Sequence, residues 1–137
     1  EEETTVTYHD PCRLGRQMGI YEEPRELIQS VEGVSIVEME HSGEDAMCCG
    51  VSSMMSCNEN ARALRVARME EIKSTGADTM LTSCPKCVSH FECLKFEGDE
   101  RYADIKILDV VSFLAQQINE KKEKIGQESG QVVESEA

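Results

Sequence analysis

The pattern of apolar and polar positions predicts a chain in which short strands alternate with helices. Runs of β-branched and apolar residues indicate four strands, at residues 4–8, 34–39, 79–83 and 105–108. Each strand is followed by a segment with a helix-starting residue, at Pro24, Asn58, Pro85 and Asp109. This alternation favours an α/β fold, a Rossmann-like open parallel sheet of about four strands with flanking helices.

Glycines and polar segments predict where these elements end. Gly33 and Gly76 stop the first two helices, and residues 12–21 fit a loop or a short turn. The last helix is expected to end near residue 124, because the sequence beyond it is polar and contains two glycines. We therefore expect one domain at residues 1–124 and a disordered tail at residues 125–137.

Charge and cysteine content narrow the functional classes. The chain has 14 basic and 27 acidic residues, a net charge of −13, which argues against nucleic acid and anionic membranes as partners. No apolar run approaches the roughly 20 residues of a membrane span. Seven cysteines, an odd number in a chain of 137 residues, favour an intracellular metal or redox protein over a disulfide scaffold.

Five of the cysteines follow the predicted strands. Cys12 comes after the first strand, a vicinal pair comes after the second, and a Cys-x-x-Cys pair comes after the third. Because the carboxyl ends of parallel strands meet at one edge of a sheet, these cysteines are expected to converge on one metal site there. The residues concerned are Cys12, Cys48, Cys49, Cys84 and Cys87.

The spacing of these thiols favours a group larger than a single ion. Cys84 precedes Pro85 at a predicted helix start, where the helix dipole favours a thiolate. Adjacent side chains such as Cys48 and Cys49 point apart in extended backbone, and Gly50 permits close approach. Five thiolates exceed the four ligands of structural zinc or of a cubane cluster. The alternatives are structural zinc, a thioredoxin-type redox pair, and buried thiols that act only as small apolar side chains.

Three motifs together resemble a known family. HDPCRLGR at residues 9–16, CCG at residues 48–50 and SCPKC at residues 83–87 look like the cysteine-rich CCG domain. Its spacing is also similar. Residues 13–47, 35 in number, separate Cys12 from the vicinal pair, and residues 50–83, 34 in number, separate that pair from Cys84. The resemblance covers roughly residues 4–115.

The resemblance implies a cofactor and a function. In heterodisulfide reductases such a domain holds a non-cubane 4Fe–4S cluster with five cysteine ligands, which reduces a small-molecule disulfide in two one-electron steps. Related domains serve electron transfer in complexes that oxidise glycolate, lactate or glycerol 3-phosphate, and some bind zinc instead. The implied partners are other iron–sulfur or flavin subunits, in the cytoplasm or attached to a membrane through those subunits. The start without Met suggests the second CCG domain of a longer chain.

Several other residues are candidates for the chemistry. His9 and His41 flank the predicted site, and either could donate a proton to a leaving thiolate or have a structural role. His90, one turn after Cys87, fits an exposed helical position. Arg13, Arg16 and Lys86 could attract an anionic substrate or could simply be solvated.

The remaining sulfur-containing residues lie outside the motif. Cys57 and Cys93 are expected to be core or free thiols. The methionines near the vicinal pair could line an apolar wall or pack in the core, and they are Met47, Met54 and Met55.

Overall fold

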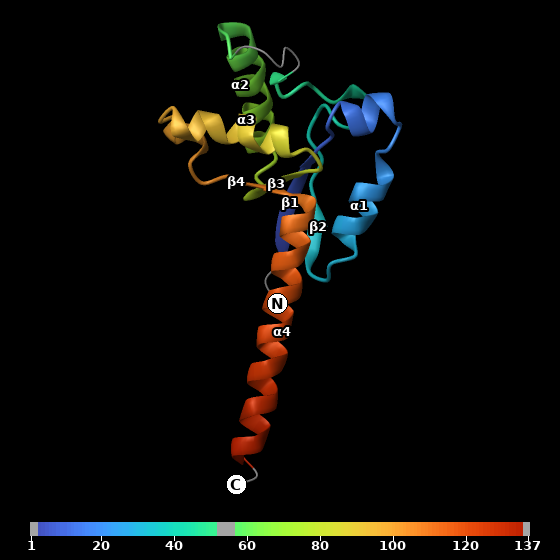
Figure 1. Ribbon diagram of the computed structural model, residues 1–137, viewed down its shortest axis with the longest axis vertical. Helices are drawn as coiled ribbons and strands as arrows, with labels where there is room; N and C mark the ends of the chain where they lie inside the picture. The colour runs from blue at the N-terminus through green and yellow to red at the C-terminus, as the bar shows by residue number, and fades with distance from the viewer. Residues whose placement is uncertain (1–2, 52–56, 136–137) are drawn as a thin grey trace.

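The computed structural model describes residues 3–51 and 57–135, and it contains one parallel four-stranded sheet (Figure 1). The strand order is β2-β1-β3-β4. The strands are β1 (Thr4–His9), β2 (Val34–Ile36), β3 (Thr79–Thr82) and β4 (Lys106–Asp109). The predicted α/β fold with an open parallel sheet is confirmed.

A helix follows each strand. The helices are α1 (Glu22–Gln29), α2 (Glu59–Ser74), α3 (Pro85–Phe96) and α4 (Val110–Ser135). The predicted caps are present: Ala61 N–H donates to Asn58 Oδ1 at 2.9 Å, and Ser112 N–H donates to Asp109 Oδ1 at 2.9 Å. The predicted loop after β1 contains a five-residue π-helical turn, η1 (Arg13–Gln17).

The two faces of the sheet carry separate cores. Along β1, Val6 and Tyr8 point to one face and pack with Ile28 of α1 and Phe113 of α4. The other face is covered by α2 and α3, and its core includes the buried side chains Met69, Ile72, Met80, Phe91 and Leu94. Because strand side chains alternate between faces, His9 at the end of β1 points toward the α2 and α3 side. Its imidazole is therefore surrounded by residues of α2 and α3.

Strand β2 is shorter than the sequence predicted. It ends at Ile36, although Val37 N–H still donates to Val6 O at 2.8 Å. The chain then leaves the sheet, because Glu38 accepts a hydrogen bond from Arg25 Nε at 2.6 Å and Met39 turns into the core under α2. The vicinal cysteines are therefore reached through a long connection and do not continue the strand.

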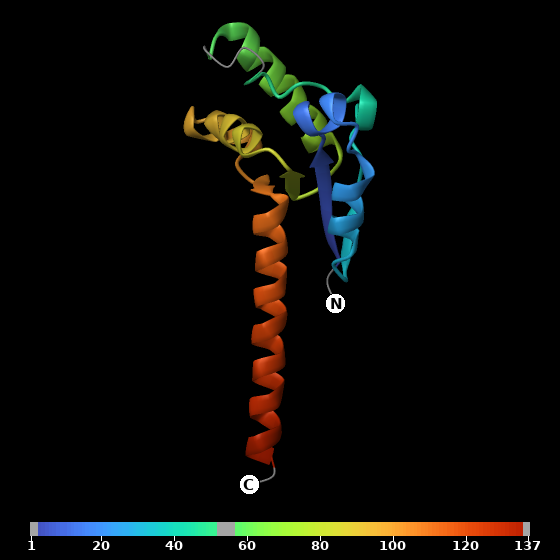
Figure 2. The same ribbon diagram turned by 45° about the vertical axis from the view of Figure 1, so that its right-hand side comes forward.

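Helix α4 differs from its predicted end. It continues to Ser135 through the segment that was expected to be a disordered tail, while residues 121–128 expose their side chains. Figures 1 and 2 show this part of α4 extending well beyond the rest of the domain. The helix persists because the segment contains no proline and several good helix formers. Within the described parts of the chain, no helix has both the length and the apolarity needed to cross a membrane.

Candidate metal centre

A pocket at the carboxyl edge of the sheet is lined by all five predicted cysteines. It has a volume of about 550 Å³, and its lining residues come from the segments that follow β1, β2 and β3 in the chain. Every cysteine of the chain lies in the described ranges, and none forms a disulfide. The thiols in the pocket are Cys12, Cys48, Cys49, Cys84 and Cys87. The structure therefore brings together the residues that the sequence selected.

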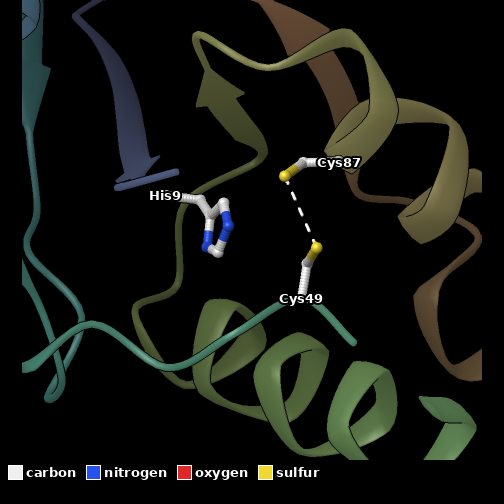
Figure 3. Close-up of side chains that lie close together, drawn as sticks. All are labelled: His9, Cys49 and Cys87. Carbon is white, nitrogen blue, oxygen red and sulfur yellow. Dashed lines mark hydrogen bonds between the residues drawn. The ribbon is translucent and has the colours of Figure 1, made fainter. Parts of the chain in front are cut away.

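Two of these thiols form a buried inner group with an imidazole (Figure 3). Cys87 Sγ lies 3.4 Å from Cys49 Sγ, and both side chains are buried. One ring nitrogen of His9 completes a set whose ligand atoms all lie within 4.8 Å of one another. Cys49 comes from the loop after β2, Cys87 from the first turn of α3, and His9 from the end of β1.

Hydrogen bonding shifts the pKa values of the two inner thiols in opposite directions. The hydrogen bond from Cys87, aided by His9 and the Val51 N–H, lowers the pKa of Cys49 to about 4. The same contact with Cys49, together with burial, raises the pKa of Cys87. Cys49 is therefore the thiolate of the pair and Cys87 is its S–H donor. A thiolate is the form that binds a metal.

The other three thiols lie nearer to solvent. Cys12 is exposed, whereas Cys48 and Cys84 are half-buried. Cys84 is the N-cap residue of α3 with Pro85 directly after it, so its sulfur lies at the positive end of a twelve-residue helix. The pocket thus has a buried inner end and an open side that a substrate could reach.

The backbone of the vicinal-cysteine segment, residues 48–50, packs tightly against α2. Gly50 has φ +97°, and a Cβ at this position would lie 2.4 Å from Ala61 O. Its N–H donates to Cys48 Sγ at 3.3 Å. Only glycine combines this conformation with so close an approach, so Gly50 holds the two cysteines against the helix.

His9 is fully enclosed and has a fixed orientation. Its Nδ1 accepts a hydrogen bond from Arg68 Nε at 2.9 Å, and Phe91 packs edge-on against the ring at 5.1 Å. Burial lowers the pKa of His9, so the imidazole is neutral at pH 7. The sequence placed His9 beside the site, and the structure places a ring nitrogen of His9 within 4.8 Å of Cys49 Sγ.

The structure does not bring His41 to the cysteines. Its side chain is about half exposed, and its Nδ1 lies 3.1 Å from Glu71 Oε1. The His41 carbonyl accepts a hydrogen bond from Arg68 Nη1 at 2.7 Å. Because the loop after β2 turns away along α2, His41 lies behind Arg68 and is absent from the lining of the cysteine pocket.

His90 differs from the sequence prediction of an exposed position. It is half-buried, and its Nε2 atom is buried 3.1 Å from the point where a Cβ of Gly50 would lie. Its spacing from Cys87 could have indicated this, because residues three apart share a helix face. Two arginines on α2 that were not among the predicted site residues, Arg65 and Arg68, are fully buried. Their signal was their place on the stripe that also carries Ala61 and Ile72.

Two polar contacts fix the loops that carry Cys12 and Cys48. The Asp10 carboxylate accepts two hydrogen bonds from Arg25, at 2.8 and 2.7 Å, and one from the Gly43 N–H at 2.8 Å. Arg16 Nη2 donates to Ala46 O at 2.7 Å. Arg16, which the sequence offered as a possible anion-binding residue, is therefore engaged in joining these two loops.

The other sulfur-containing residues have separate places. Met47 lines a small cavity that shares four of its cysteines with the pocket, whereas Met54 and Met55 lie outside the described residues. Cys57 is exposed and accepts a hydrogen bond from Arg65 at 3.5 Å, and Cys93 is half-buried on α3. Both are free thiols away from the pocket lining.

The donor set suits a group that is larger than one ion. Structural zinc requires four ligand atoms about 2.0–2.3 Å from a single centre. In the described parts of the chain, only His9, Cys49 and Cys87 bring three such atoms within 4.8 Å of one another. The other cysteines are arranged around a pocket of about 550 Å³. Five free thiols spaced around such a volume fit a multi-atom cluster.

Comparison with known families agrees with this geometry. Residues 6–92 match the profile of the family described as the CCG cysteine-rich domain. That range covers more than half of the chain and includes all five cysteines of the pocket.

Individual relatives are parts of larger oxidoreductases. The chain is 39% identical over 114 residues to a subunit of the dihydromethanophenazine:CoB–CoM heterodisulfide reductase of Methanosarcina acetivorans, with 82% of this chain and 27% of the relative aligned. It is 35% identical over 130 residues to the "Probable iron-sulfur-binding oxidoreductase FadF" of Bacillus subtilis, with 90% of this chain and 18% of the relative aligned.

A third relative has a different named reaction. This relative, a subunit of the fumarate reductase (CoM/CoB) of Methanothermobacter marburgensis, is 36% identical over 112 residues, with 80% of this chain and 22% of the relative aligned. The chain thus spans about a quarter or less of the length of these curated relatives. It belongs to the CCG cysteine-rich domain family, as the kind of domain that iron–sulfur oxidoreductase subunits carry.

Proposed function

We propose that this chain is the iron–sulfur domain of a heterodisulfide-reductase-like oxidoreductase. In this proposal Cys12, Cys48, Cys49, Cys84 and Cys87 hold a non-cubane 4Fe–4S cluster. The observation that carries it is the lining of one pocket by five free thiols. When bound, such a cluster supplies electrons one at a time to a disulfide substrate.

The chain's own residues suit the binding of such a substrate. The outer wall of the pocket combines apolar side chains, Leu14 and Met18, with the cationic side chains of Arg13 and Lys86. Thiols that carry acidic groups form disulfides that are both apolar along the chain and anionic at the ends. This wall matches that chemistry, with the cations orienting the anionic ends.

The two histidines contribute differently in this proposal. His9 is neutral and buried against Cys49, so it acts as an N–H donor to sulfur rather than as a source of free protons. His41 takes no part in the reaction in this proposal, because it contacts Arg68 and does not line the cysteine pocket. The proton for a departing thiolate comes from solvent at the open side of the pocket, where Cys12 is exposed.

Partners and location follow from the same proposal. The relatives are named as subunits, so this domain would receive electrons from other iron–sulfur or flavin subunits in the cytoplasm. Attachment to a membrane would occur through those subunits. The alternative is a pure electron-transfer domain, as in complexes that oxidise glycolate, lactate or glycerol 3-phosphate. The relative named as an iron–sulfur-binding oxidoreductase, without a disulfide in its name, favours that alternative.

The first experiment is metal analysis of protein prepared without air. We expect about four iron and four sulfide per chain. About one zinc and no sulfide would instead indicate a structural zinc domain and would remove this proposal. Oxidised protein that has then received one electron should change its paramagnetic signal when CoB–CoM heterodisulfide is added. A signal that stays the same would favour plain electron transfer.

Cysteine variants test the ligand set. We expect Cys49→Ala to lose most of its iron, because it removes the thiolate at the buried end of the pocket. Cys57→Ala is the matched control and should keep its iron, since Cys57 is exposed and outside the pocket. Iron content measured per folded chain gives the answer. The reverse pattern would show that the ligand set is wrong.

A further inference from the structure

Helix α2 contains two arginines whose side chains have no exposed surface. Arg65 and Arg68 are three residues apart and face the same core as the inner thiols. A buried guanidinium is costly unless its N–H groups have partners. Each of these arginines directs one N–H at a histidine ring nitrogen, and this shared arrangement is informative.

Arg68 determines which nitrogen of His9 carries the proton. Its Nε donates to His9 Nδ1 at 2.9 Å, while its Nη1 is held by Glu71 Oε2 at 2.9 Å. An arginine has no acceptor atom, so Nδ1 must be unprotonated and the proton must lie on Nε2. His9 also has a ring nitrogen within 4.8 Å of Cys49 Sγ. That N–H is therefore directed at sulfur.

Arg65 has the same relation to His90. Its Nη1 lies 3.4 Å from His90 Nδ1, 3.4 Å from the His90 carbonyl oxygen and 3.5 Å from Cys57 Sγ, and its Nη2 donates to Glu97 at 2.9 Å. With Arg65 as donor to Nδ1, the proton of His90 lies on Nε2. That nitrogen is buried, has no hydrogen-bond partner among the described residues, and lies against Gly50. A buried N–H donor therefore faces the vicinal-cysteine segment without an acceptor.

We propose that α2 uses its two buried arginines to fix two histidines as N–H donors to the vicinal-cysteine segment. His9 donates to Cys49, and His90 donates to a sulfur atom that becomes available when the site is loaded. Arg65 and Arg68 are positioning residues, because they act through the imidazoles. The part that concerns a bound sulfur rests on the proposed function, whereas the tautomers are a property of the protein alone.

For a site that holds an iron–sulfur cluster, these N–H donors would change the reduction potential through electrostatics. N–H donors stabilise negative charge on thiolate and sulfide atoms, and the reduced state of a cluster carries more of that charge. Two donors next to Cys48 and Cys49 therefore raise the reduction potential. The carboxylates of Glu71 and Glu97 are bonded to the arginines themselves.

The tautomers are tested first, by long-range ¹H–¹⁵N NMR of the histidine rings in the full chain, reduced and without metal. We expect the Nε2–H form for both His9 and His90. An Nδ1–H form at either ring in the unaltered chain would overturn the proposal, and this measurement needs no variant to fold. It is also independent of which metal the chain binds.

Two arginine variants form a matched pair. Arg65→Met should release His90 into a mixture of tautomers. Arg62→Met should leave the ring unchanged, although Arg62 also contacts Glu97, at 3.0 Å. An Arg65→Met chain that is folded and keeps the single Nε2–H form would show that Arg65 does not position His90.

The reduction potential of iron–sulfur-loaded protein tests the donor role. His90→Leu should shift the midpoint potential downward, and His90→Gln, which places an amide N–H near the same point, should recover part of the shift. Ser89→Ala, on the exposed side of α3, should leave the potential unchanged. Equal potentials in His90→Leu and the unaltered chain would overturn the donor role of His90. Failure to bind iron would count against the proposed function, while the NMR result still decides the tautomers.

Discussion

At the scale of single residues, Gly50 connects the vicinal cysteines to the scaffold. Its backbone lies so close to α2 that an added Cβ would be 2.4 Å from Ala61 O and 3.1 Å from His90 Nε2. Its φ of +97° is also unfavourable for any residue with a side chain. The position therefore combines two separate requirements for glycine, one conformational and one steric.

We expect Gly50→Ala to lower the free energy of unfolding by about 3 kcal/mol, the sum of the positive-φ penalty and an overpacking term. Gly76→Ala is the control, because Gly76 has φ +74° but nothing within 4 Å of the added Cβ. It should show only the conformational part, about 1 kcal/mol. Urea titration of both variants measures the difference. Equal losses would mean that the contact with Ala61 has no steric effect.

At the scale of elements, one acidic residue joins the loop after β1 to helix α1 and to the loop after β2. Asp10 is buried and bonds Arg25 through both oxygens, and Arg25 also contacts Glu38 at 2.6 Å. Burial by itself would raise the pKa of Asp10, but Arg25 and the Gly43 N–H outweigh it and hold that pKa below its ordinary value. Ionised Asp10 thus stabilises the folded state.

This contact should make stability depend on pH. A carboxyl group whose pKa is lower in the folded state than in the unfolded state stabilises the fold. This stabilisation is complete above the pKa of the unfolded state, about 3.9, and is lost as the pH falls through the pKa of the folded state. We expect Asp10→Asn to lose about 3 kcal/mol at pH 7, because it leaves Arg25 with a weakened buried partner. The loss should shrink below about pH 4, where Asp10 begins to protonate in the unfolded state of the unaltered chain and the stability from its ionised form declines.

Urea titrations of metal-free protein between neutral and acidic pH measure this dependence. Glu38→Gln is the control, since the Glu38 side chain is 42% exposed, and it should cost less than about 1 kcal/mol. A loss for Asp10→Asn that is constant over the whole pH range would contradict the assignment of an ionised Asp10.

At the scale of the whole molecule, the pocket and the end of α4 lie far apart. Figure 1 shows the cysteine-bearing loops at one end of the sheet and the C-terminus at the far end of the projecting helix. The contacts of α4 with the core come from its first turns, through Val110, Phe113 and Leu114. Lys121 makes only an exposed ion pair with Glu32, at 3.1 Å.

A chain that ends after Lys121 should therefore keep its fold and its metal. We expect the free energy of unfolding to change by less than about 1 kcal/mol, because the side chains of residues 122–128 are exposed. Phe113→Ala, at 3% exposure, should cost about 3 kcal/mol by comparison. Urea titration and iron content measure both effects. Loss of iron on truncation would show that the far part of α4 supports the site.

Local signals in the amino-acid sequence were enough to predict the fold class and the cysteines of the pocket. Strand and helix signals depend on neighbouring residues, and the alternation of the two indicates a parallel sheet. Cys12, Cys48 and Cys84 follow successive strands, so topology alone predicted that they converge. The helix caps at Asn58 and Asp109 were also readable, because capping depends on the few residues next to each helix start.

The surroundings of the thiols, in contrast, depend on tertiary packing. Whether a histidine or an arginine is buried depends on which element packs over it, and that information is not local. His41 was therefore placed too near the site and His90 too far from it, while Arg65 and Arg68 were missed. The same applies to the inner sulfur contact of 3.4 Å between Cys49 and Cys87, which exists because the loop after β2 folds between α2 and α3.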